Sequence, residues 1–154
     1  MKGLRAILLG GVVAGALDII YAFVHYGIAF DLSPVRICQS VAAGILGKEA
    51  ARAGGLETAA LGLGLHFMMA TMMAGFFVIV ASRIPLLTRR AWVMGPIYGL
   101  GLYFVMNYIV VPLSNAGHSG PPQGQVLVGA LFTHIFLVGL PIALIAKFYS
   151  DRSR

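Results

Sequence analysis

The chain has 154 residues, of which 59% are hydrophobic and 10% charged, with a net charge of +6. This composition excludes an ordinary soluble domain, in which about a quarter of the residues are charged. It also excludes nucleic-acid binding as the reason for the positive charge, because lysine and arginine gather at the ends of apolar segments, where they orient a membrane protein. We therefore expect one membrane domain over residues 1–154, in contact with a lipid bilayer.

The first predicted span covers residues 6–30. Its start resembles a secretory signal, but the apolar run continues to spanning length, so we expect it to remain as an anchor and first helix. Gly11 and Gly15 form a G-x-x-x-G motif, and Gly95 and Gly99 form a second one farther along the chain. Such motifs let helices approach closely, and we favour packing of the first motif within the chain over dimerisation.

An acid and an imidazole lie inside this first span. Asp18, Tyr21 and His25 fall on one face at the helical repeat, and the rest of the circumference is apolar. An aspartate near the bilayer centre costs about 2.5–3.5 kcal/mol on insertion scales, so it normally points into a bundle and finds a partner there. The sequence therefore predicts that other helices bury this face.

An amphipathic helix is predicted next, over residues 34–53. Ser33 suits the N-cap, Pro34 suits the first helical position, and Gly54 with Gly55 ends the segment. We expect this helix to lie in the membrane interface or to dip in partway, either as a lid over the bundle or as a simple connector. Its apolar side comprises Val35, Ile37, Cys38, Val41, Ala42, Ile45 and Leu46, and its polar side Arg36, Gln39 and Ser40.

Three further spans are predicted over residues 57–81, 91–111 and 126–146. The first of them carries His66, the next carries Tyr103 and Asn107 on one face, and the last carries His134 and Pro141. A proline inside a helix frees a carbonyl of the preceding turn, so we expect Pro141 to bend its span. The fold class predicted is an all-α bundle of four transmembrane helices with one interfacial or re-entrant helix.

The distribution of basic residues predicts the orientation. Eight fall on one side of the membrane and three on the other, which places both termini in the cytoplasm. His118, in the loop between the last two spans, is expected to be solvated. The larger group is Lys2, Arg5, Arg83, Arg89, Arg90, Lys147, Arg152 and Arg154, and the smaller group is Arg36, Lys48 and Arg52.

Polar groups from every span are predicted to meet in the outer half of the bundle. At about 1.5 Å of rise per residue, His66 and His134 reach nearly the same depth, and the other polar side chains fall within about one turn of it. The predicted pocket consists of Asp18, Tyr21, His25, His66, Tyr103, Asn107 and His134.

Three interpretations of this cluster stay open. It is a hydrogen-bonded network that fixes helix register, or a pocket for a proton or small ligand, or a cofactor site in which His66 and His134 ligate a b-type haem or a metal ion. Nucleophile-elbow, phosphate-loop, H-E-x-x-H and paired-cysteine motifs are absent from the sequence, which does not favour an enzyme.

Short motifs in the second half of the chain carry a family resemblance. They are His66-Phe67, Pro85, Gly95 with Tyr98-Gly99, Val111-Pro112-Leu113 and His134. From His66 onward the chain resembles the YagU-type family of bacterial inner-membrane proteins, which brings no established activity to carry over. The resemblance implies a bacterial inner membrane and one four-helix unit.

The function expected from the sequence is that of a small, non-enzymatic integral membrane protein. Its polar pocket would bind a proton or small ligand or take part in transport, or the protein would act as an accessory subunit of a larger membrane complex or form a homo-oligomer. The alternatives are a haem- or metal-binding redox protein and a purely structural subunit.

Overall fold

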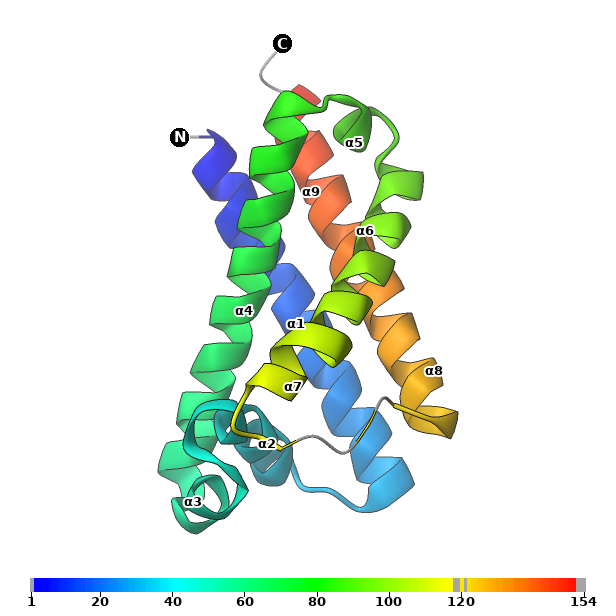
Figure 1. Cartoon of the computed structure of the whole chain (residues 1–154). Helices are drawn as coiled ribbons and strands as arrows, with labels where there is room; N and C mark the ends of the chain where they lie inside the picture. The colour runs from blue at the N-terminus through cyan, green and yellow to red at the C-terminus, as the bar shows by residue number, and fades with distance from the viewer. Residues whose placement is uncertain (1, 118–119, 121, 152–154) are drawn as a thin grey trace.

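The computed structural model describes residues 2–117, 120 and 122–151, and these form an all-α bundle (Figure 1). Within the described residues, four helical segments are long and apolar enough to cross a membrane. They are α1 (Lys2–Phe30), α4 (Gly55–Arg83), Ala91–Leu113 and Gly124–Asp151. The predicted four-span fold is confirmed, and each helix reaches or exceeds its predicted limits. Helix length and composition thus make this a polytopic membrane protein whose spans contact lipid.

The third and fourth spans each contain a π-helical segment. The third joins α6 (Ala91–Val105), η1 (Met106–Val110) and α7 (Val111–Leu113), and the fourth joins α8 (Gly124–Phe132), η2 (Thr133–Gly139) and α9 (Leu140–Asp151). Pro112 follows η1 and Pro141 follows η2 closely. Because proline cannot donate the next backbone hydrogen bond, the preceding turn is free to widen. The bend expected at Pro141 stays a prediction, and what the structure shows there is a π-helical segment that ends two residues before this proline.

The helix predicted over residues 34–53 is two helices, α2 (Pro34–Leu46) and α3 (Lys48–Ala53). Its start is as predicted, since the Ser33 side chain accepts a hydrogen bond from the Arg36 backbone N–H. The continuous helix is wrong because Gly47 adopts φ 82°, a conformation that ends α2. At about 1.5 Å per residue α2 is about 20 Å long, too short to cross a bilayer.

The predicted faces of α2 also need correction. Gln39 was placed on the polar side, but it is only 4% exposed and its Nε2 donates to the Gly55 carbonyl at 2.9 Å. Ile45 and Leu46 were placed on the apolar side, yet both are exposed. The reason is that α2 packs along the first part of α4, so contact with that helix, rather than the apolar pattern alone, decides which side is buried.

Glycines set the closest helix crossings. A Cβ at Gly11 would overlap Thr71, and one at Gly15 would meet the ring of Phe67, so this G-x-x-x-G motif packs α1 against α4 within the chain, as predicted. The second motif joins the third span to the fourth. A Cβ at Gly99 would overlap the carbonyl of His134.

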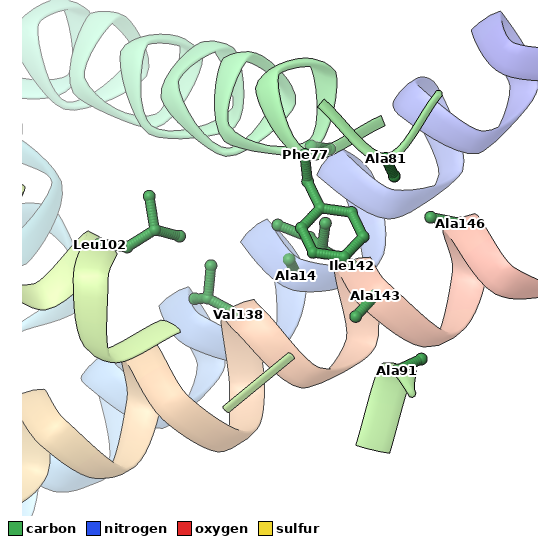
Figure 2. Packing of buried hydrophobic residues seen from close by; sticks show 10 residues of the cluster. Ala14, Phe77, Ala81, Ala91, Leu102, Val138, Ile142, Ala143 and Ala146 are labelled. Carbon is green, nitrogen blue, oxygen red and sulfur yellow. The ribbon is translucent and has the colours of Figure 1, made fainter. Parts of the chain in front are cut away.

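Large and small apolar side chains of α1, α4 and the third and fourth spans pack together in the bundle (Figure 2). Phe77 of α4 and Ile142 of α9 are the largest fully buried side chains among the described residues. Alanines surround them and allow the helices to approach. The cluster comprises Ala14, Ala74, Phe77, Ala81, Ala91, Leu102, Val138, Ile142, Ala143 and Ala146. This cluster is the packed apolar core of the bundle.

The start of α1 and the end of α9 lie at the same end of the bundle, together with α5 (Leu86–Arg89), while α2, α3 and α7 lie at the other end (Figure 1). This arrangement follows from an even number of spans. Arg152 and Arg154, which entered the predicted orientation, lie outside the described residues, as does His118.

Labelling of Cys38, the only cysteine of the sequence, tests the docking of α2 on α4. The side chain is 6% exposed, and burial raises the pKa of its thiol, so we expect slow reaction with a maleimide. Gly62→Val should raise the labelling rate at least about tenfold, because its side chain would overlap the Cys38 carbonyl and displace α2. Gly64→Val is the control, since a Cβ there meets nothing within 4 Å. Equal labelling of both variants would contradict this packing.

Candidate functional site

A cavity of about 360 Å³ lies between the spans, in the half of the bundle away from the termini. All four spans and α2 contribute to its wall. Five of the side chains singled out from the sequence line it, namely Asp18, Tyr21, His66, Asn107 and His134. The rest of the wall is mostly apolar, including Met69, Met73 and Val138. The cavity therefore combines an apolar body with a few polar groups, the usual composition of a small-ligand site.

Asp18 is the single acid among the described residues that line the cavity. It is half-buried in α1, lines the same cavity as Thr133, and lies within electrostatic range of His66 and His134. No lysine or arginine lines the described wall. The carboxylate thus sits among neutral or titratable groups, with no permanent cation of the described lining to balance it.

Each cavity histidine uses one ring nitrogen on a backbone carbonyl. The Nε2 of His66 lies 2.8 Å from the Gly15 carbonyl oxygen of α1, and the Nδ1 of His134 lies 2.8 Å from the carbonyl oxygen of Ala130 in its own span. A carbonyl only accepts, so these nitrogens donate. In the neutral ring, Nδ1 of His66 and Nε2 of His134 are then left as acceptors.

His25 and Tyr103 do not belong to the described lining of the cavity. His25 stacks on Tyr21, with ring centroids 5.2 Å apart, and its Nε2 is buried without a partner in the described part of the chain. Tyr103 is 3% exposed and meets the ring of His134 edge to face, with centroids 6.0 Å apart. His25 and Tyr103 therefore contact side chains of the cavity wall without belonging to the described wall themselves.

The sequence interpretation missed Tyr26, Ser40 and Thr133, which also line the cavity. Tyr26 follows Asp18 by eight residues, about 80° around the helix from it and outside the face that was considered. Ser40 was assigned to the polar side of α2. Thr133 directly precedes His134. A hydroxyl group next to a histidine inside a membrane span was the signal that could have identified it.

Both π-helical segments lie at the cavity. Asn107 is in η1 and donates its Nδ2 to the Tyr103 carbonyl at 2.9 Å, and His134 is in η2. A π-helical turn changes the angular position of the residues that follow it, and such turns are frequent at functional sites. The crossing at Gly99 then holds the His134 backbone against α6.

Metal ligation has limited support in the geometry. Among the described residues, no group of three or more histidine, cysteine, aspartate or glutamate side chains is placed to hold a metal ion. The pair His66 and His134 stays a predicted ligand set for haem or metal, since both line the same cavity and each neutral ring keeps one nitrogen lone pair.

The chemistry available in the cavity is that of hydrogen-bonding and ionisable groups beside an apolar wall. One carboxylate, two histidines and several hydroxyl groups provide acceptors and donors around an apolar volume. Comparison of the chain with protein-family models, with curated proteins and with solved structures found no match.

Proposed function

We propose that this membrane protein binds a small organic cation in the cavity between its spans, with Asp18 as the counter-ion. The observation that carries the proposal is the position of Asp18, a single intramembrane carboxylate at a cavity whose described wall has no lysine or arginine. An intramembrane acid marks a site when it lacks a fixed partner, because its charge is costly in lipid. A protonated amine or quaternary ammonium group supplies that partner.

The aromatic side chains of the wall support a cationic ligand. Tyr21 and Tyr26 line the cavity, and Tyr26 lies within electrostatic range of both Asp18 and Tyr21. The faces of aromatic rings attract ammonium groups, and the attraction increases when water is excluded. Thioethers of Met69 and Met73 add a polarisable apolar surface for the rest of the molecule.

The size of the cavity limits the ligand. Ligand pockets commonly measure about 300–1,000 Å³, and about 360 Å³ is at the lower end of that range. A ligand of a few to about ten non-hydrogen atoms is expected. The protein could transport such a cation or hold it for a partner subunit, and both functions begin with binding.

The resemblance to the YagU-type family supports a bacterial inner membrane. The basic residues support an orientation with both termini in the cytoplasm. Those that the structure describes at the end shared by the termini are Lys2, Arg5, Arg83, Arg89, Arg90 and Lys147.

A series of n-alkylammonium ions from ethyl to hexyl tests the proposal by thermal unfolding of the detergent-purified protein. We expect the unfolding temperature to rise with chain length until the cavity is full and then to fall, because a ligand that binds only the folded state stabilises it. The n-alcohols of equal length should give smaller shifts, since they lack the charge that pairs with Asp18. Equal shifts for alcohols and ammonium ions, or a steady rise with chain length, would contradict a charge-selective cavity.

The rival function, a haem- or metal-carrying redox protein, is favoured by one observation, the shared cavity of His66 and His134. An absorption spectrum and elemental analysis of the wild type, His66→Ala and His134→Ala decide it. A Soret band or stoichiometric metal that both variants lose would replace the organic-cation proposal with cofactor binding.

A further inference from the structure

A second cavity, of about 330 Å³, lies between α2, α3 and the segment after α7, at the end of the bundle opposite the termini. Three cationic side chains line it, Arg36, Lys48 and Arg52, and no acidic residue belongs to its described wall. It shares only Ser40 with the described lining of the first cavity. Its charge therefore requires a separate explanation.

The fold brings these cations together from two helices. Gly47, at φ 82°, ends α2 and allows α3 to start in a new direction. Lys48 and Arg52 are four residues apart and share one face of α3, and Arg36 lies on the face of α2 that lines the same cavity. Like charges at this spacing repel, so the arrangement costs free energy unless an anion is bound.

The three cations have no ion-pair partner in the described part of the chain. Lys48 points toward the segment after α7, because a Cβ at Gly117 would lie 3.7 Å from its Nζ. That segment is fixed on α2, since Asn115 donates its backbone N–H to the Gly44 carbonyl at 2.9 Å and its side-chain Nδ2 to the Ile45 carbonyl at 2.7 Å. The three cations are exposed, and the segment held on α2 by Asn115 forms one ordered wall of the cavity.

A buried polar group lies beside this cavity. Gln39 lines this cavity, is 4% exposed and donates its Nε2 to the Gly55 carbonyl at 2.9 Å, but its Oε1 is buried without a partner in the described residues. An unsatisfied buried acceptor costs about 1–3 kcal/mol. Because this oxygen is closed to solvent, it is a cost of packing α2 on α4 and not a contact for a ligand.

We propose that this cavity binds a phosphate group that carries no cation of its own, the chemistry of glycerol phosphate. Arginine guanidinium groups and the lysine ammonium group pair with phosphate oxygens. The cavity lies at one end of the bundle, beside α2, which is too short to span the membrane. Lipid headgroups are within reach at that end. A phosphatidylglycerol headgroup and soluble glycerol phosphate both offer this chemistry, and the experiment separates them.

Native mass spectrometry of the full chain in mild detergent tests the proposal. Phosphatidylglycerol, phosphatidylcholine and sn-glycerol 3-phosphate are added in separate titrations. We expect either phosphatidylglycerol or glycerol 3-phosphate to bind in preference to phosphatidylcholine. The first result identifies a lipid source and the second a soluble source. No preference for either over phosphatidylcholine overturns the proposal.

Two double variants test whether the binding takes place at this cavity. Arg36→Gln with Arg52→Gln should weaken it at least about tenfold, because two charge-assisted hydrogen bonds are lost. Arg89→Gln with Arg90→Gln removes the same charge at the opposite end of the bundle and should leave the affinity unchanged. An equal loss in both double variants would overturn the site. If the first double variant does not fold, Lys48→Gln, an exposed side chain, decides, and an affinity equal to wild type would reject the site.

Discussion

Gly99→Ala is expected to destabilise the protein by about 1–3 kcal/mol, the cost of overpacking a close contact. A Cβ at Gly99 would overlap the carbonyl of His134 and crowd the Cα of Ile135. These are backbone atoms, so no side-chain rotation relieves the contact, and α6 and η2 must separate. Because His134 lines the cavity, binding of alkylammonium ions should weaken together with stability.

Gly101→Ala provides the matched control for this prediction. Gly101 lies two residues farther along α6, and a Cβ there meets nothing within 4 Å. Alanine also has the higher helix propensity, so this variant should be as stable as wild type or slightly more stable. Thermal unfolding in detergent gives the comparison. Equal unfolding temperatures for Gly99→Ala and wild type would show that the third and fourth spans do not cross at this glycine.

Asp18→Asn is expected to stabilise the ligand-free protein by about 1–3 kcal/mol, because it removes a charge that is costly within the membrane and keeps the shape of the side chain. A residue retained for binding is often unfavourable for stability. If Asp18 instead serves a structural network with Thr133, His66 and His134, the same change should destabilise the protein.

Asp31→Asn is the control for the loss of one carboxylate. Asp31 does not line the cavity and has φ 53°, a conformation that asparagine tolerates. Its unfolding temperature should stay close to that of wild type. A lower unfolding temperature for Asp18→Asn than for Asp31→Asn would support the structural interpretation over ligand binding.

The spans could be predicted because their signal is local. An apolar stretch of spanning length forms a helix in lipid whatever its neighbours are, since its backbone must satisfy its own hydrogen bonds. The division at Gly47 could not be predicted in this way, because a glycine within a helical pattern also fits a continuous helix. The prediction that Gln39 lies on the polar, solvent-facing side of α2 was wrong for a related reason. Contact with α4 decides which side of α2 is buried.

The candidate site was predictable to the extent that its chemistry is rare. Asp18, His66 and His134 are conspicuous because ionisable residues are costly inside a membrane, and the structure brings all three to one cavity. Residues of ordinary type, such as Tyr26 and Thr133, give no such signal. Which side of a span faces the cavity also depends on the π-helical turns, and these arise from packing and proline together.

Isothermal titration of n-butylammonium into the wild type, Asp18→Asn and Asp31→Asn tests the central claim most directly. We predict one site per chain in the wild type and in Asp31→Asn, and an affinity at least about tenfold weaker in Asp18→Asn, because the charge-assisted contact is lost. Equal affinity in all three proteins, or no saturable binding to the folded wild type, would contradict a cation site at Asp18.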